Sequence, residues 1–471
     1  MTPGQLIEFF REPVLETIGI TAGALFIAVV LGAPLGVAIA AGGPLGRVVN
    51  AIALLVRAIP DLVLAVVFVA ALGFGPAAGT LALGLQNAAV AAKLFAELLL
   101  AVRREPAEAL RASGATPVAA FLVGLLPTAY PAIVGFGAYI VDCVIRNSVI
   151  VGVVGAGGLG TAILQALNLA DFRAFGLFFA AIALFIIIFD AFAEWLRSRA
   201  PAWVAGVTLL ATGAVGVAAF AALSSTPFAR FAQAPGRIAH FVARAFPPQF
   251  DGTVVHAALV GAQETLVVAA VGTLGGALLA LPVAWLIARP LASGWMRGTG
   301  WRPWSLVPEL IARVGLSGLR SIPYVAMGLL ATLVVGLGPR AGAVALVLIT
   351  AAVLGRLLAE SLELGPFAAA EALVAGGATA TAGALVGLVP DAVPLFATHV
   401  LYRWEYNIRA STILGMVGAG GLGQQIFNAQ ELLFYHQLLA YVLVAIVLVA
   451  VSDMLGALVR RRLVIDTVLR T

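Results

Sequence analysis

A fifteen-residue string occurs twice in this chain. RNSVIVGVVGAGGLG occupies residues 146–160, and its near-copy RASTILGMVGAGGLG occupies residues 409–423, 263 residues later. The same offset aligns residues 57–160 with residues 320–423 without a gap, and 47 of the 104 paired positions are identical. Such self-similarity indicates a tandem repeat, so we expect each half of the chain to form the same set of elements.

The alignment continues upstream with a shorter offset of 248, which pairs Glu16-Thr17 with Glu264-Thr265. The second half has therefore gained 15 residues, around the tryptophan-rich stretch GWMRGTGWRPW at residues 294–304. This organisation predicts two domains joined by an external segment. We expect the first domain at residues 1–200, the second at residues 201–471 and the external linker at residues 224–255.

The composition is that of a membrane protein. Hydrophobic residues make up 62% of the chain and charged residues 10%, with a mean hydropathy of +1.08. Soluble domains are about half apolar and a quarter charged. Uncharged runs such as residues 17–46 and 62–92 are longer than the roughly 20 apolar residues that cross a bilayer as a helix. The sequence therefore predicts an all-α polytopic membrane protein.

Hydropathy predicts about 11 transmembrane helices, five in the first half and six in the second. An additional span at residues 203–223 lets both repeats share one orientation, because five spans alone would invert the second copy. Arginine-rich loops gather on one side, which the positive-inside rule assigns to the cytoplasm together with the C-terminus, leaving the N-terminus outside. The expected spans are residues 14–41, 52–74, 77–100, 128–155, 173–196, 203–223, 258–288, 318–337, 340–362, 391–418 and 433–457.

One arginine-bearing segment falls on the external side. FARFAQAPGRIAHFVARAF, residues 228–246, places arginines at every seventh position, 230, 237 and 244. Residues seven apart share a helical face, which favours an amphipathic helix lying in the membrane interface. An ordinary loop is the alternative.

The charged residues exclude an ATP-binding chain. Only Lys93 among the 27 basic residues is a lysine, and it lies outside any Gly-Lys-Ser/Thr motif of a P-loop. If ATP drives transport, ATP and Mg²⁺ must therefore bind to a separate subunit, and we expect this chain to bind no cofactor and to catalyse no reaction. The single cysteine, Cys143, permits no internal disulfide. The histidines are scattered and offer no metal site: His240, His256, His399 and His436.

A second duplicated string lies between the third and fourth expected spans of each half. EALRASGATPVAAFLVGLLP occupies residues 108–127, and EALVAGGATATAGALVGLVP occupies residues 371–390. Both begin with Glu-Ala-Leu, place glycine six residues after the glutamate and end in proline. We expect a short helix, a glycine-permitted bend and a second short helix ended by proline, which together form a cytoplasmic elbow. Ordinary amphipathic helices are the alternative.

The spacing Glu-Ala-x4-Gly-x12-Pro resembles the EAA coupling loop of binding-protein-dependent (MetI-like) ABC importer permeases. In that family the loop docks in a cleft of the ATP-binding subunit and transmits its closure. The resemblance implies two tandem type-I ABC importer transmembrane domains. The third position of the family motif is usually alanine and is leucine in both copies here. The resemblance implies an ATPase-coupling role for Glu108, Ala109, Gly114, Pro127, Glu371, Ala372, Gly377 and Pro390.

The second half more narrowly resembles phosphonate-import permeases of the PhnE type, through the strings RSIP, GLGPRAG, LLAE and LYRWEYNIRASTILGMVGAGGLG. The first half departs from this pattern, with Asp142 and Cys143 where the second half has Glu405 and Tyr406. Members usually carry one unit per chain and pair as homodimers, so this chain looks like two fused units. The resemblance implies two ATP-binding subunits, a periplasmic or lipid-anchored solute-binding protein and one copy of this chain per transporter, in the bacterial inner membrane.

Two arginines open the near-identical strings. Arg146 and Arg409 lie within expected spans, where a charge costs at least about 2.5–3.5 kcal/mol and is paired or functional. Asp142 and Glu405 lie four residues earlier on the same helix face, so each arginine could simply be neutralised by its neighbour. The other interpretation places all four in the pathway, where a guanidinium matches two oxygens of an anion.

A further pair of arginines belongs to the same set of pathway candidates. Arg57 and Arg320 occupy the start of the second expected span of each half. They are weaker candidates, because a long basic side chain at that place can also extend to the membrane interface.

The glycine string that ends both copies is no nucleotide cradle, since no strand precedes it. Glycines permit the chain to leave a helix and re-enter it where the backbone is buried or lines a cavity. We expect such turns to shape the external mouth where a binding protein docks, with close helix packing as the alternative. The residues concerned are Gly155, Gly157, Gly158, Gly160, Gly418, Gly420, Gly421 and Gly423.

The sequence as a whole predicts the permease of an ATP-driven importer for phosphonate or a related phosphorus oxyanion, with no nucleic-acid partner. An ABC permease for an amino acid such as methionine is the first alternative. A secondary transporter driven by an ion gradient through Asp61 or Glu97 is the second, and the duplicated elbow argues against it. A membrane-embedded enzyme is the third, for which no nucleophile–base set is evident.

Overall fold

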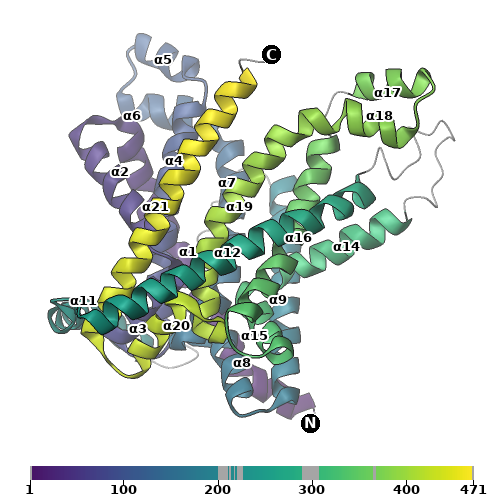
Figure 1. Ribbon diagram of the computed structural model, residues 1–471. Helices are drawn as coiled ribbons and strands as arrows, with labels where there is room; N and C mark the ends of the chain where they lie inside the picture. Colours follow the sequence, from purple (N-terminus) through teal and green to yellow (C-terminus); the bar gives the residue numbers. More distant parts are fainter. Residues whose placement is uncertain are drawn as a thin grey trace. The chain divides into compact units, whose positions relative to one another are not determined.

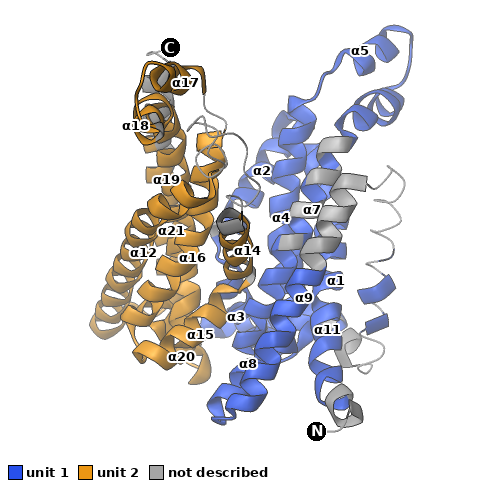
Figure 2. Cartoon of the chain, turned by 90° about the vertical axis from the view of Figure 1, so that its right-hand side faces the viewer, with its two compact units in different colours: residues 1–246 blue, residues 247–471 orange. Residues whose placement is uncertain are grey.

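The computed structural model describes residues 3–199, 226–288, 307–363 and 367–468, with a few positions between 211 and 219. Within these ranges every regular element is helical and no strand occurs, as the composition predicts. The chain forms two compact units, Met1–Phe246 and Pro247–Thr471 (Figure 2). Most of the expected span at 203–223 and the whole tryptophan-rich insertion lie outside the described residues.

The first unit is built around the long helix α1, which packs along α4. Small residues permit this approach, since a Cβ placed on Gly32 would lie 2.6 Å from the Ala91 Cβ. The elements of this unit are α1 (Pro3–Ala41), α2 (Gly43–Ala58), α3 (Asp61–Leu72), α4 (Pro76–Ala101), α5 (Glu105–Ala112), α6 (Pro117–Ala119), the π-helical η1 (Ala120–Leu125), α7 (Leu126–Val151), the π-helical η2 (Gly152–Ala156), α8 (Gly158–Asn168), α9 (Phe172–Arg199) and α11 (Thr226–Ala245).

The second unit repeats this order. Its helix α12 packs along α16 as α1 does along α4 (Figure 1), and a Cβ on Gly276 would lie 2.5 Å from the Thr350 Cβ. The elements of this unit are α12 (Gly252–Ile287), α14 (Val307–Ser321), α15 (Tyr324–Val335), α16 (Pro339–Glu363), α17 (Phe367–Ala375), α18 (Ala380–Gly387), α19 (Val389–Leu414), the π-helical η5 (Gly415–Ala419), α20 (Gly421–Glu431) and α21 (Tyr435–Val468).

Five described helices are long and apolar enough to cross a membrane unbroken, and up to nine spans result if four bent pairs each count as one. The expected total of about eleven stays a prediction. The unbroken helices are Glu8–Ala41, Pro76–Ala101, Gly252–Ile287, Pro339–Glu363 and Tyr435–Gly456.

The second expected span of each half is not one straight helix, which corrects the prediction of continuous helices at residues 52–74 and 318–337. The chain breaks before Pro60 and Pro323, where the flanking helices are bent by 89° and 95°. Ile59 is extended, with φ −78° and ψ 123°. Proline disfavours the helical conformation of the residue before it and itself lacks an N–H.

The arginine-bearing segment folds as the helix α11, which packs on α3 and α4 of the first unit. The Nη1 of Arg237 donates a hydrogen bond to the Leu72 carbonyl at 2.9 Å, at the end of α3, where a cation suits the helix dipole. The first compact unit, Met1–Phe246, therefore includes α11. The expected domain boundary at residue 200 stays a prediction. The interfacial position of α11 stays a prediction.

Candidate functional site

The first string that begins Glu-Ala-Leu folds as a helical elbow. Helix α5 ends at Ala112, and the chain turns through Gly114, whose φ is 91°. Thr116 then caps the next helix, because its hydroxyl accepts a hydrogen bond from the Ala119 amide at 3.2 Å. The bend at the glycine therefore has the geometry that the spacing predicts.

The second elbow has the same construction. After α17 the chain turns through Gly377, whose φ is 97°, and Thr379 caps α18 by accepting from the Ala382 amide at 3.2 Å. Helices α17 and α18 lie side by side, next to the N-terminal end of α19 (Figure 1). Apart from the chain neighbours, no atom of the described residues lies within 4 Å of a Cβ placed on either bend glycine, so backbone conformation rather than space requires glycine there.

Each elbow is held together by one further glycine, Gly124 in the first and Gly387 in the second, whose role was not predicted. A Cβ on Gly124 would lie 2.7 Å from the Ala107 Cα, and a Cβ on Gly387 would lie 2.7 Å from the Ala370 Cα. These close approaches join the two helices of each elbow into one packed unit. Both pairs are related by the offset of 263, so the alignment of the repeats already held the signal.

The prolines that end the motif lie in the first turn of the following helix. Pro390 follows a true break, because α18 ends at Gly387 and the chain bends by 62° before α19. Pro127 follows no break, since η1 continues into α7 with helical dihedral angles at Leu125. The expected helix end at Pro127 is therefore wrong, and the widened π-helical turn before it accommodates a residue without an N–H.

Each elbow presents apolar side chains to solvent. Val123 is 67% exposed in the first elbow, and Val386, its repeat equivalent, is 66% exposed in the second. Leu122 and Leu385 form a second exposed equivalent pair. Exposed apolar patches of this kind mark surfaces that contact another protein or the membrane. The eight residues that match the coupling motif are also exposed: Glu108, Ala109, Gly114, Pro127, Glu371, Ala372, Gly377 and Pro390.

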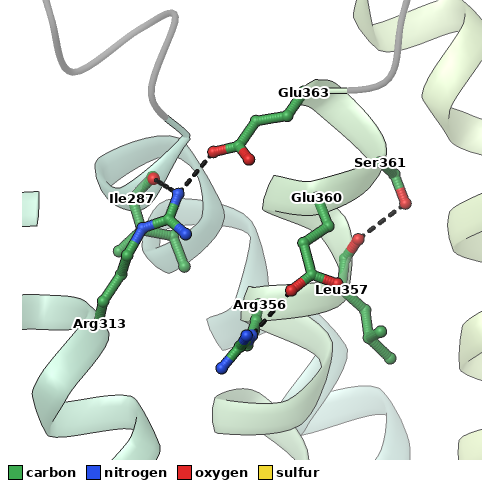
Figure 3. Close-up of polar contacts among 7 residues, drawn as sticks. All are labelled: Ile287, Arg313, Arg356, Leu357, Glu360, Ser361 and Glu363. Carbon is green, nitrogen blue, oxygen red and sulfur yellow. Dashed lines mark hydrogen bonds and ion pairs between the residues drawn. The ribbon is translucent and has the colours of Figure 1, made fainter. Parts of the chain in front are cut away.

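Arg313 of α14 links the helix ends that lie next to the start of the second elbow. Its Nη2 lies 2.5 Å from Glu363 Oε1 at the end of α16 and donates to the Ile287 carbonyl of α12 at 2.9 Å (Figure 3). Ala370 and Ala384 of the elbow pack in the same buried cluster as Ile287. The elbow is therefore connected to three helices of its unit.

The first elbow lacks this clamp. The repeat equivalent of Arg313 is Asn50, whose side-chain oxygen accepts from Lys93 Nζ at 3.2 Å, and Lys93 also lies 3.6 Å from Glu97. The equivalent of Glu363 is Leu100. Glu97, a candidate of the ion-driven alternative, is thus an exposed side chain paired with its helical neighbour.

The intramembrane arginine of the second half has a partner on another helix. Arg409 forms an ion pair with Asp453 of α21. Glu405 is buried against the same helix, since a Cβ on Gly456 would lie 1.7 Å from its Oε1. This interhelical ion pair favours a structural role for Arg409. Its partner was not predicted, although the repeat places a carboxylate at both equivalent positions, Asp453 and Asp190.

In the first half, Arg146 lies half-buried on α7. The side chain of Asp142, its expected neighbour, lies outside what the structure describes. Arg57 and Arg320 occupy the last turns of α2 and α14. The expected position at the start of a span is therefore wrong for both, because the break before each following proline makes the arginine a C-terminal residue, where a cation is favourable.

The glycine strings form the predicted turns. Gly155, Gly157 and Gly158 have φ values of 90°, 89° and 79°, and lead the chain from η2 into α8, which is bent by 54° from the preceding helix. Gly418, Gly420 and Gly421 repeat this with 91°, 75° and 78°. Positive φ at consecutive positions demands glycine.

The last glycine of each string permits close helix packing, which was the alternative prediction. A Cβ on Gly160 would lie 2.0 Å from the Val149 carbonyl oxygen, and one on Gly423 would lie 1.8 Å from that of Thr412. The glycine turns and the close helix packing are therefore both present, at different residues. The external mouth and the docking of a binding protein there stay predictions.

Each turn is fixed by an acidic residue of the unit's first helix. Glu16 Oε2 accepts from the Gly158 amide at 2.6 Å, and Glu264 Oε2 accepts from the Gly421 amide at 2.7 Å. Thr17 accepts in the same way from the Leu159 amide at 2.9 Å. A carboxylate at a helix N-terminus satisfies free amides and the helix dipole. The Glu-Thr pairs anchored the repeat alignment, but their capping role was not predicted.

Comparison with known proteins identifies the class. The chain matches the binding-protein-dependent transport system inner membrane component family twice, at residues 28–201 and 302–465. It therefore belongs to this family and is a multi-pass ABC importer permease of the MetI-like type with the family domain in duplicate.

Its relatives extend this assignment. The phosphate-import permease protein PhnE of Mycolicibacterium smegmatis is 32% identical over 469 residues, covering 96% of this chain and 85% of that protein. The phosphite transport system permease protein PtxC of Stutzerimonas stutzeri is 34% identical, covering 57% of this chain and 90% of that protein. The methionine ABC transporter MetNI aligns over 43% of this chain and 100% of its own, with 25% identity and a TM-score of 0.39.

Proposed function

We propose that this chain forms the translocation pathway of an ATP-driven importer for a phosphorus oxyanion, such as a phosphonate, phosphite or phosphate. Transport proceeds by alternating access, which the two elbows couple to ATP hydrolysis on a separate subunit. The observation that carries this proposal is the duplicated elbow, with its exposed apolar side chains at equivalent positions.

The cargo assignment draws on the relatives. The two relatives are named as permeases for phosphate import and for phosphite transport. Both cargoes are small oxyanions of phosphorus, with oxygens that an arginine fork can bind in pairs. A phosphonate shares that group and is the cargo expected from the sequence resemblance.

The partners follow from the proposed mechanism. Two ATP-binding subunits hold ATP and Mg²⁺ and dock on the exposed apolar residues of the elbows. A solute-binding protein, periplasmic or lipid-anchored, delivers the anion at the glycine turns. One copy of this chain supplies both halves of the pathway, with the elbows and the C-terminus in the cytoplasm and the N-terminus outside.

The test is uptake by proteoliposomes that contain this chain with its ATP-binding subunit and binding protein. Labelled phosphate, phosphite, 2-aminoethylphosphonate and methionine are offered in turn, with ATP inside the vesicles. We expect ATP-dependent uptake of at least one phosphorus compound. Uptake of methionine alone would establish the amino-acid alternative, and oxyanion uptake without the ATP-binding subunit would refute ATP coupling.

A double substitution tests whether the ATP-binding subunit docks on the exposed apolar residues of the elbows. Val123→Asp with Val386→Asp should release the ATP-binding subunit, because each substitution places a charge in an apolar contact. The matched control is Val123→Leu with Val386→Leu, which keeps both surfaces apolar and should retain the complex. Normal co-purification of the aspartate variant would show that the elbows dock elsewhere.

A further inference from the structure

The second unit contains an arginine, Arg403, that forms no ion pair with any acidic side chain among the described residues. Arg403 of α19 donates a hydrogen bond from Nη2 to the Tyr324 hydroxyl at the start of α15. Its Nε is buried and has no hydrogen-bond partner among the described residues. Within the same described part of the chain, no acidic side chain lies in ion-pair distance of this guanidinium.

Two aromatic rings hold this guanidinium. Its carbon lies 5.5 Å from the centre of the Tyr324 ring and 4.9 Å from that of Tyr406, and the two ring centres are 5.3 Å apart. Aromatic rings attract a cation but do not neutralise it. The rings therefore leave the guanidinium of Arg403 without a carboxylate partner among the described residues, whereas Arg409 on the same helix is paired with Asp453.

The cluster borders a surface that the described helices leave uncovered. Tyr406 is 41% exposed, and Tyr402, one turn earlier on α19, is 56% exposed. Asn407, one turn after Arg403 on the same helix, is instead fully buried and bonded to Thr273, so Arg403 lies between the exposed tyrosines and a covered part of α19. A small anion can therefore approach the guanidinium along the exposed face of α19.

The first half has no equivalent of this cluster. The offset of 263 pairs Arg403 with Ile140, Tyr324 with Asp61 and Tyr406 with Cys143. Asp61 accepts instead from Asn147 of α7. A carboxylate thus occupies, in the first repeat, the position of a tyrosine that holds a cation in the second.

We propose that Arg403, positioned by Tyr324 and Tyr406, is an anion-binding residue of the second half and takes a phosphorus oxyanion with at least two free oxygens. This assignment rests on the proposed function. The guanidinium offers a planar fork to two oxygens, and the Tyr324 hydroxyl, which accepts from Arg403, keeps its own hydrogen for a third.

The test compares Arg403→Gln, Arg403→Lys, Tyr324→Phe and the control Arg47→Gln in the reconstituted importer. Arg47→Gln removes the same charge at an exposed site outside the cluster. Initial uptake of the transported oxyanion and basal ATPase activity are measured for each complex. We expect Arg403→Gln to reduce initial uptake about tenfold or more, because a charged hydrogen-bond pair is lost, whereas the control Arg47→Gln should retain both uptake and basal ATPase activity.

The remaining variants decide between charge and shape. Arg403→Lys should recover uptake only in part, since it restores the charge without the fork, and Tyr324→Phe should reduce uptake less than Arg403→Gln. Uptake by Arg403→Gln at the control level would overturn the assignment. If that variant does not assemble, near-normal uptake by both Arg403→Lys and Tyr324→Phe would overturn it instead. If the wild type carries no phosphorus oxyanion, the proposed function fails first and the assignment with it.

Discussion

Arg313 reaches across the root of the second elbow to Glu363, and the same guanidinium binds the last carbonyl of α12 at Ile287 (Figure 3). The elbow begins at Phe367, four residues after Glu363, and packs on the cluster that contains Ile287. The contact therefore joins the ends of α12 and α16 next to the cluster on which the elbow packs. The first elbow, with Asn50 in the place of Arg313, lacks the same restraint.

We expect Arg313→Leu to loosen the second elbow and lower substrate-stimulated ATPase activity while basal activity persists. The loss leaves Glu363 and the Ile287 carbonyl without this partner, which costs about 1–3 kcal/mol for a partly buried group. Thermal unfolding and stimulated ATPase activity measure the two effects. Arg356→Leu is the control, since its pair with Glu360 is exposed and of little energetic weight. Equal effects of both variants would contradict a specific clamp.

Two glycines of the first elbow allow the cost of an unfavourable backbone conformation to be distinguished from the cost of a steric clash. Gly114→Ala should destabilise the complex by about 1–2 kcal/mol, because only its positive φ opposes a side chain. Gly124→Ala should be more disruptive for docking, since its Cβ would lie 2.7 Å from the Ala107 Cα and force the two elbow helices apart. Binding of the ATP-binding subunit measures both, and stronger loss with Gly114→Ala would contradict this assignment of roles.

The features that could be predicted from the sequence alone are local ones: two similar halves, an elbow bend at each motif glycine and a helix break at each GAGGLG string. Positive φ and proline effects belong to single residues and their neighbours, so the spacing carried them. Interhelical partners were not predictable in the same way. Neither Asp453 for Arg409 nor Ala107 for Gly124 follows from periodicity, because each depends on how two distant helices pack. The breaks before Pro60 and Pro323 could have been predicted from the prolines themselves. The prediction of continuous helices followed the long apolar run around each proline instead.

The caps at the glycine turns should be stabilising in both halves. Glu264→Ala removes the acceptor of the Gly421 amide at the start of α20, and losing a helix cap costs about 0.5–2 kcal/mol. Glu264→Gln keeps an acceptor oxygen and should cost less. Thermal unfolding of the purified complex checks the order. Equal stability of the alanine variant and the wild type would show that this bond adds nothing.

The start of α12 should respond to pH through Asp251. Its carboxylate accepts from the Val254 amide at 2.8 Å, with further bonds from Thr253 and Gln249, and these bonds lower its pKa below the ordinary value of 3.8. A carboxyl group with a lowered folded-state pKa contributes stability above its unfolded pKa and loses it as pH falls through the folded value. The stability difference between wild type and Asp251→Ala should therefore shrink below about pH 4. A constant difference down to pH 2.5 would contradict this origin.

The ion pair of Arg409 and Asp453 allows a structural arginine to be distinguished from a pathway arginine. Arg409→Ala leaves the Asp453 carboxylate without this partner at a position about two-thirds buried, and one-sided removal of a buried ion pair costs up to about 3–5 kcal/mol, less where solvent reaches it. We expect low membrane levels of this variant and recovery in Arg409→Ala with Asp453→Ala, since the double variant leaves neither charge behind. Recovery of oxyanion uptake together with the protein level would assign Arg409 to structure. Normal levels of the single variant with lost uptake would instead assign Arg409 to the pathway, because a group that contacts cargo affects transport without affecting assembly.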